Sequence, residues 1–126
     1  MTIATLLDAS AILAWLWAEP GSDAVDRAFC VGDVGCTAAN WAEVVAKVVA
    51  SRGEWGLAEA ALMGRGLVIV PVDVDDAVEA GRMSMAHPTA SLGDRLCLAA
   101  GQRLLATILT VNRQWAGVSP AVVLIR

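Results

Sequence analysis

Residues 3–18 read IATLLDASAILAWLWA, and this stretch indicates how the chain folds. Residues 3–7 form a short apolar run of the kind that fills a buried strand, and the run ends at Asp8. Asp8-Ala-Ser10 then opens a segment rich in alanine and tryptophan that reaches residue 18, which favours a helix. A strand that leads directly into a helix is typical of a parallel α/β sheet.

The same alternation continues to the end of the chain. Further helices are expected over residues 22–30, from the Thr37 cap to 51, over 55–63, from a cap at Asp73 or Asp75 to 86, and over 91–104. Strands are expected at Cys36, after a turn at 31–35, and over 67–70, 106–110 and 121–125, with a helical turn after Asn112. The sequence therefore predicts a single α/β domain over residues 1–126, in three layers, with a central parallel sheet of four to five strands flanked by helices.

The composition excludes several classes of protein. With 57% hydrophobic residues in 126, the chain can build a core without metal or disulfide staples. Its longest stretch without a charged residue, 114–125, is shorter than the roughly 18 residues of a membrane span, and no basic residue precedes the apolar segment at 9–18. We therefore expect a cytoplasmic protein with no membrane contact. Cys30, Cys36 and Cys97 form no C-x-x-C pair and are expected to be free, buried thiols.

The charges are distributed unevenly along the chain. Residues 1–94 hold 13 acidic and 5 basic side chains, whereas residues 95–126 hold no acid and four arginines: Arg95, Arg103, Arg113 and Arg126. This pattern suits a metal-binding acidic cluster beside a surface for a phosphate backbone. A solvated basic edge is the alternative interpretation.

Three acids and one amide stand where strands give way to helices. Asp8 ends the first strand, Glu43 and Asp94 lie in the first turns of two helices, and Asn112 follows the fourth strand. Each also has a structural explanation, because Asp8 can cap its helix, Glu43 can pair with Lys47, and Asp94 fits a capping box with Ser91. In a parallel sheet, however, such positions meet at the carboxyl edge, where sites lie.

Carboxylates that meet in one cleft require a cation, and hard oxygen ligands favour Mg²⁺ or Mn²⁺. A metal-dependent nuclease follows, because divalent ions on carboxylates activate water and stabilise charge on a scissile phosphate. The single histidine, His87, offers no acid–base pair, and no nucleophile-elbow or phosphate-loop motif is present.

Four stretches in order resemble the signatures of PIN-domain proteins, and most of all the VapC-type ribonuclease toxins of toxin–antitoxin pairs. They are LLDASAILA (6–14), NWAEV (40–44), SLGDRLCLA (91–99) and TVNRQW (110–115). The third is the most specific, and the resemblance covers essentially the whole chain.

The resemblance implies a Mg²⁺- or Mn²⁺-dependent endoribonuclease that a small antitoxin protein neutralises. Asp8, Glu43 and Asp94 correspond to the family's acidic catalytic and metal-binding residues, and Ser10 and Thr110 to supporting hydroxyls near the metal. It also implies that the first helix and its neighbours form the antitoxin groove and contribute to a homodimer.

Among the four tail arginines, Arg95 and Arg113 are the expected contacts to RNA, because they lie nearest the proposed site. Trp15 and Trp17, two residues apart on the first helix, cannot both face one core, so one of them is expected to be exposed or at an interface.

One position departs from the family pattern. Where the family usually has Thr-x-Asp, this chain has Thr110-Val-Asn112. Asn112 can still ligate a metal or hold its water, but three carboxylates against two divalent ions leave a net charge of +1, so a second ion is expected to bind weakly until a phosphate arrives. Reduced activity, or a degenerate PIN domain that only binds its partner, are alternatives. A third, the Asp-x-Asp pattern of haloacid-dehalogenase-type phosphatases at residues 73–75, is less favoured because Pro71 already ends the strand.

Overall fold

The computed structural model describes residues 2–126. In chain order its elements are β1 (Thr5–Leu7), α1 (Ala9–Leu16), α2 (Ser22–Val31), β2 (Val34–Thr37), α3 (Ala38–Ala50), α4 (Trp55–Gly64), β3 (Val68–Val70), α5 (Val74–Arg82), α6 (Leu92–Leu104), β4 (Thr107–Thr110), the 3₁₀ turn η1 (Arg113–Trp115) and β5 (Val122–Leu124). The strands form one sheet in the order β3-β2-β1-β4-β5, and every neighbouring pair is parallel. The predicted α/β fold with a parallel sheet is confirmed.

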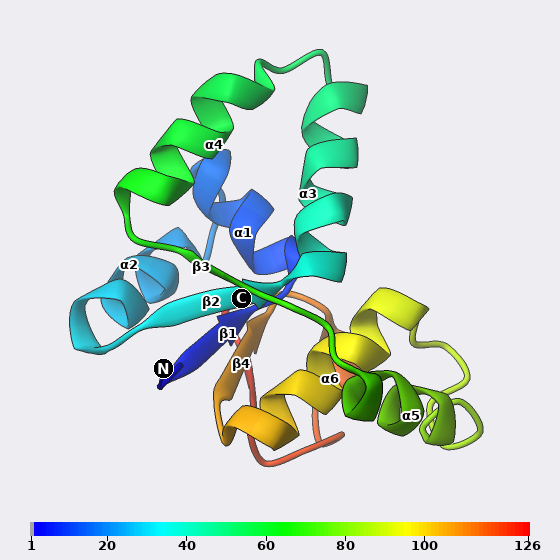
Figure 1. Ribbon diagram of the computed structural model, residues 1–126. Coiled ribbons are helices and arrows are strands. Elements are labelled where there is room, and N and C mark those ends of the chain that lie inside the picture. The colour runs from blue at the N-terminus through cyan, green and yellow to red at the C-terminus, as the bar shows by residue number, and fades with distance from the viewer. Residues whose placement is uncertain (1) are drawn as a thin grey trace.

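Two layers of helices cover the sheet (Figure 1), and strand residues alternate between the two cores. Leu7 and Leu109 pack with α1 to α4 on one face. Leu6 and Ile108, their neighbours along the strands, pack with α6 on the other face. Because both faces of the sheet are covered, β1 and β4 carry buried apolar side chains on both faces.

Side chains at the N-cap positions start four of the helices. Asp8, Thr37 and Ser91 cap α1, α3 and α6 as expected, each accepting a hydrogen bond from the backbone N–H three residues on. Asp73 rather than Asp75 caps α5. A cap fixes where its helix begins. The caps of α1, α3 and α6 therefore also fix where the candidate acids Asp8, Glu43 and Asp94 lie at the carboxyl edge of the sheet.

Some boundaries differ from the expectation. β2 begins at Val34, inside the predicted turn, because Gly35 serves a close strand contact: a Cβ there would lie 2.9 Å from the Val68 carbonyl oxygen. α1 ends at Leu16 and α5 at Arg82, after which Ser84 bonds the carbonyl of Gly81 in a turn.

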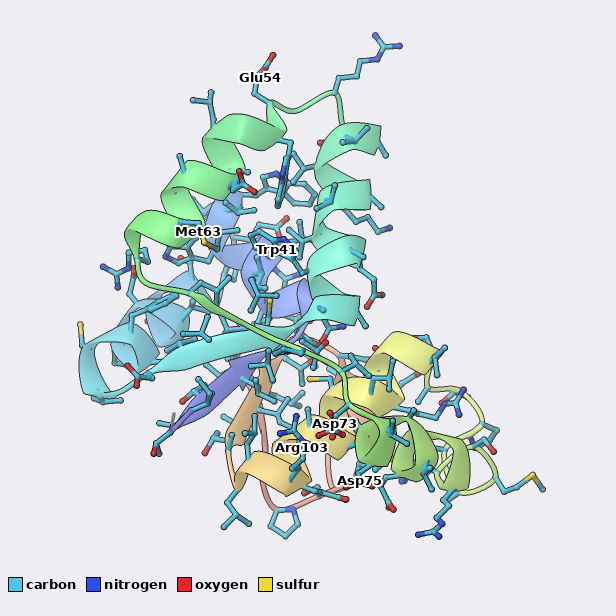
Figure 2. All side chains as sticks on the ribbon, viewed as in Figure 1. Trp41, Glu54, Met63, Asp73, Asp75 and Arg103 are labelled. Atoms are coloured by element: carbon cyan, nitrogen blue, oxygen red, sulfur yellow. The ribbon has the colours of Figure 1, made fainter. Side chains whose placement is uncertain are left out.

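The acids of residues 73–76, one alternative site, tie two helices together. Asp73 and Asp76 close a capping box on α5, and the Arg103 guanidinium of α6 forms two hydrogen bonds with the Asp76 carboxylate at 2.8 and 2.9 Å. Asp73 also lies 3.2 Å from Arg103 Nε, beside it in Figure 2. The guanidinium lowers the pKa of Asp76. These contacts account for the acids without a phosphatase site.

The tryptophans and cysteines show where sequence reasoning succeeded and where it did not. Trp15 is half-buried and Trp17 is 46% exposed, as the two-residue spacing predicted. Cys36 and Cys97 are buried free thiols, but Cys30 is exposed, contrary to expectation, because it lies on the solvent side of α2.

Among residues 2–126, no helix has the length and apolar character needed to cross a membrane.

Candidate metal centre

The proposed site begins at the switch point of the sheet, where β1 and its neighbour β4 end side by side. Asp8 follows β1 and is 3% exposed. Thr110, the last residue of β4, donates a hydrogen bond from Oγ1 to Asp8 Oδ2 at 2.5 Å. Ser10 Oγ donates to Asp8 Oδ1 at 2.6 Å, and the Ala11 N–H donates to the same oxygen at 2.9 Å. Three donors therefore orient the carboxylate.

The two hydroxyls are themselves oriented by the backbone that follows β4. Ser10 Oγ accepts from the Val111 N–H at 3.0 Å, and Thr110 Oγ1 accepts from the Asn112 N–H at 3.0 Å. Because the backbone donors occupy an acceptor site on each oxygen, both hydroxyl protons point at Asp8. The structure thus places Ser10 and Thr110 where supporting hydroxyls were expected.

Burial raises the pKa of Asp8, and the negative charge of Asp94 raises it further, although the hydrogen bonds from Ser10, Thr110 and Ala11 oppose the shift. A buried carboxylate with a second one nearby is an unfavourable arrangement for a protein without a cation. The charge of a divalent ion would offset both the burial and the repulsion.

Glu43 reaches the same place from α3. Its Oε1 accepts a hydrogen bond from Asn40 Nδ2 at 2.6 Å, and no ion pair within residues 2–126 joins it to Lys47. The carboxylate lies directly against the backbone of Gly93 in α6, so closely that a Cβ on Gly93 would collide with Oε1. Glu43 is therefore held between an amide of its own helix and the first turn of α6.

Asp94 belongs to that first turn of α6. Its Oδ2 accepts from the Ser91 N–H at 3.0 Å and its N–H donates to Ser91 Oγ at 3.1 Å, the capping box that the sequence indicated. Capping uses Oδ2, and the other oxygen remains available as a ligand, so coordination and capping are compatible.

The three acids lie near one buried thiol. Burial raises the pKa of Cys97 well above its usual range, and the charges of Asp8, Cys36, Asp94 and Glu43 add to the shift. A hollow of about 200 Å³ lies over them. Its lining consists of Asp8, Ala9, Ser10, Leu13, Glu43, Lys47, Asp94 and Asn112. All four proposed metal ligands therefore meet in one hollow.

The donors fit a hard divalent cation, although they do not yet enclose one. Within residues 2–126, no three Asp, Glu, His or Cys side chains lie close enough to form a coordination sphere as they stand. Each carboxylate is instead engaged with protein donors: Asp8 with two hydroxyls, Glu43 with Asn40 and Asp94 with Ser91. The oxygen donors and the unfavourable burial of Asp8 nevertheless suit Mg²⁺ or Mn²⁺.

Asn112 lies at the rim of this hollow and also starts the turn that follows β4. Its Oδ1 accepts from the Gln114 N–H at 3.0 Å. Since an amide oxygen has two lone pairs, this bond leaves it able to hold a metal or a metal-bound water. Lys47, one turn after Glu43, brings the only basic side chain of the lining, and the formal charge of three carboxylates and one ammonium is −2.

Three of the four arginines of residues 95–126 are engaged within the protein, so fewer are free to meet a phosphate backbone than the sequence suggested. Arg95 does not line the hollow, because its NH1 donates to the Ala80 carbonyl of α5 at 2.8 Å. Arg103 is paired with Asp76, and Arg126 with Glu19 at 3.4 Å. Arg113 is exposed next to Asn112, and no ion pair in the described part of the chain involves it. Of the two expected RNA contacts, Arg113 is the exposed one, and the role of either arginine stays a prediction.

A comparison with protein families agrees with this geometry. The family model described as PIN domain matches residues 5–119. The chain belongs to the PIN-domain family. The matched residues include all four stretches that carried the resemblance from residue 6 to residue 115.

Solved structures share the fold of this PIN-domain chain over almost its full length. A toxin–antitoxin complex from Klebsiella pneumoniae has a TM-score of 0.79 at 18% identity, with 98% of each chain covered. VapBC2 from Rickettsia felis, bound to a DNA fragment from its promoter, has a TM-score of 0.76 at 14% identity, with 97% of each chain covered. DNA-bound VapBC from Salmonella typhimurium has a TM-score of 0.69 at 14% identity, with 99% of this chain and 100% of that chain covered. No protein of curated function matches the sequence significantly.

Three residues of this PIN domain escaped sequence reasoning. Asn40, Lys47 and Gly93 contact or line the site, but none was a candidate. The spacing of Asn40 and Lys47, three before and four after Glu43, places them on the same helical face and could have indicated them. Nothing local marks Gly93, because its role depends on where α3 lies.

Proposed function

We propose that this PIN domain is a Mg²⁺- or Mn²⁺-dependent endoribonuclease toxin that hydrolyses RNA phosphodiester bonds in the cytoplasm. The observation that carries the proposal is the meeting of Asp8, Glu43, Asp94 and Asn112 in one hollow at the carboxyl edge of the sheet. The family match and the toxin–antitoxin complexes that share the fold support it.

In this proposal Asp8, Glu43 and Asp94 hold the metal, and Asn112 completes the donor set with an amide oxygen. The bound ion would supply an activated water and neutralise charge on the scissile phosphate. Ser10 and Thr110 keep Asp8 oriented and hold their protons on its two oxygens. Arg113, exposed beside Asn112, is placed to meet the phosphate backbone of the RNA.

The experiment compares cleavage of a structured RNA by the purified chain with Mg²⁺, with Mn²⁺ and with excess chelator. We expect cleavage only with metal, and we expect Asp8→Asn and Asp94→Asn to abolish it. Asp33→Asn is the matched control, because Asp33 is an exposed acid that directly precedes β2 at the opposite edge of the sheet. Undiminished cleavage by both site variants, or activity in chelator, would refute the assignment.

The second candidate is a degenerate PIN domain that binds a partner without cleaving RNA. The amide at Asn112 and the engagement of each carboxylate by protein donors favour it. A Mn²⁺ titration followed by electron paramagnetic resonance decides between the two, because the nuclease requires a bound ion and the binding module does not.

An apolar hollow supports the proposed antitoxin partner. It lies between α1, α3 and α4 and is lined by Leu16, Trp17, Val48, Gly53, Glu54, Leu57, Ala58 and Ala61. Trp17 is 46% and Leu57 is 73% exposed, and both line this hollow, where apolar side chains gathered on one surface are typical of an interaction site. A small antitoxin with an amphipathic helix would cover them, and Leu57→Asp should then abolish its co-purification with this chain.

A homodimer is also proposed, and light scattering of the purified chain tests it.

A further inference from the structure

Asn40 stands out among the buried polar side chains of this structure. It is 1% exposed, and its side chain makes one hydrogen bond, from Nδ2 to Glu43 Oε1 at 2.6 Å. Its Oδ1 is also buried and has no hydrogen-bond partner. Burying an amide with an unsatisfied oxygen is destabilising, so the residue requires an explanation other than stability.

Helix capping does not explain it. Asn40 is the third residue of α3, and in a capping box the side chain at this position reaches back to the N-cap backbone. The corresponding residues of α5 and α6, Asp76 and Asp94, both do so. In α3 the Thr37 side chain accepts from the Asn40 N–H, but the Asn40 side chain turns forward to Glu43. The third residue of α3 thus bonds Glu43, whereas the third residues of α5 and α6 bond the backbone of their N-cap residues.

The surroundings of Glu43 show what this contact does. Its Oε1 lies against Gly93 of α6 and accepts the 2.6 Å hydrogen bond from Asn40 Nδ2. Glu43 is a long, exposed side chain with several rotamers, and these two contacts select one of them. Partners of this kind orient metal ligands in proteins and change metal affinity when they are removed.

We propose that Asn40 is a positioning residue that holds the Glu43 carboxylate at the metal site, which explains its burial with an unsatisfied oxygen. The inference rests on the proposed metal site at Asp8, Glu43 and Asp94. Asn40 contacts neither metal nor RNA. It acts through Glu43, so its loss weakens metal binding without weakening the fold.

The test is Asn40→Leu, which keeps the branched shape of the side chain and removes both polar atoms. We expect the dissociation constant for Mn²⁺, measured by electron paramagnetic resonance, to rise about 10- to 100-fold. The melting temperature in chelator should stay equal to that of the wild type or rise, since an unsatisfied buried oxygen is removed. Val44→Ala is the control: it empties a fully buried position next to Glu43, so it should lower the melting temperature and leave Mn²⁺ affinity unchanged.

A second readout is independent of any variant at Asn40. The chain has four side-chain amides, at Asn40, Gln102, Asn112 and Gln114, so their nuclear magnetic resonance signals are few and assignable. Mg²⁺ should shift the Asn40 side-chain signal in the wild type but not in Glu43→Gln, with Gln102, on the far side of α6 beside Arg103, as the internal reference.

The possible outcomes separate the two proposals. If the wild type binds Mn²⁺ and Asn40→Leu binds it within twofold as tightly, Asn40 has no positioning role, although the metal site stands. A melting temperature that falls together with Mn²⁺ affinity in Asn40→Leu, and an Asn40 signal unmoved by Mg²⁺, would make the residue structural and overturn the inference. A wild type that binds no Mn²⁺ overturns both the inference and the proposed function.

Discussion

Gly93→Ala should inactivate the site while leaving the fold intact. A Cβ at position 93 would collide with Glu43 Oε1 and lie 3.0 Å from its Cδ. What must give way is the end of a flexible, exposed side chain, so the cost falls on the position of the carboxylate and hardly on the core. Once displaced, Glu43 can no longer accept the 2.6 Å hydrogen bond from Asn40.

Two effects of opposite sign set the change in the free energy of unfolding. Replacing a helical glycine by alanine contributes about 0.5–1 kcal/mol of stability. Losing the hydrogen bond costs about 1–3 kcal/mol, because the Asn40 amide that stays behind is buried and loses its one side-chain partner. We therefore expect a free energy of unfolding between that of the wild type and about 2 kcal/mol below it. Metal affinity and cleavage rate should nevertheless fall by about 10- to 100-fold, because a ligand has lost its position.

Two other helical glycines provide matched controls. Gly81 of α5 has no atom within 4 Å of the added Cβ, so Gly81→Ala should raise the melting temperature by a few degrees with unchanged activity. At Gly101 the Cβ would lie 2.5 Å from Ile108 Cδ1 in the core, so Gly101→Ala should cost about 1–3 kcal/mol.

The assay measures urea denaturation in chelator, Mn²⁺ affinity and RNA cleavage for all three variants. The reasoning is wrong if Gly93→Ala binds Mn²⁺ and cleaves RNA like the wild type. It is also wrong if Gly93→Ala is destabilised clearly more than Gly101→Ala, since the collision would then fall on the core.

Three further predictions concern other parts of the molecule. Asp76→Asn should cost about 2 kcal/mol at pH 7, measured by urea denaturation, because it breaks a paired contact with Arg103 at a site 2% exposed. Arg103 lowers the pKa of Asp76 in the folded state, so this contribution is fully present above the unfolded value of 3.8 and decreases as the pH falls from there through the lowered folded pKa; a difference between variant and wild type that does not shrink between pH 5 and pH 2 would contradict this. Asn112→Asp adds a carboxylate to the hollow and should raise cleavage at low Mg²⁺ but not at saturating Mg²⁺, whereas superimposed rate curves would show that the amide already suffices. Arg113→Gln should reduce the slope of log affinity for RNA against log salt by about 1, whereas Arg82→Gln, which lies on α5, should leave the slope unchanged.

Much of the fold could be predicted from local patterns. The apolar runs at β1, β3 and β4 mark strands by their composition. The caps at Asp8, Thr37 and Ser91 mark the starts of α1, α3 and α6, because each is a hydrogen bond to the backbone three residues on. Predictions failed where a distant segment decided the outcome. Gly35 read as a turn residue, but it lies in a strand because Val68 approaches it closely.

Distant segments also decide how far the four arginines of residues 95–126 are available. These residues contain no acid, which suggested a basic surface. In the structure, Arg103 and Arg126 meet acids from segments more than 20 residues away, and Arg95 meets a backbone carbonyl of α5. The clustering of arginines in the sequence therefore overestimated the number of unpaired arginines at the surface.

The sequence by itself determined the parallel α/β order, the helix caps, the PIN family and the acids at the ends of β1 and at the starts of α3 and α6. These follow from periodicity, from short-range hydrogen bonds and from motifs, which act within a few residues. Only the tertiary structure decided how those acids are held: Asp8 by a hydroxyl from β4, and Glu43 between Asn40 and Gly93. The physical reason is that the Asp8–Thr110 and Glu43–Gly93 contacts join segments that are distant in the chain, which no local pattern encodes. The spacing of Asn40 and Glu43 is visible in the sequence, but the burial of Asn40 is decided only by the tertiary structure.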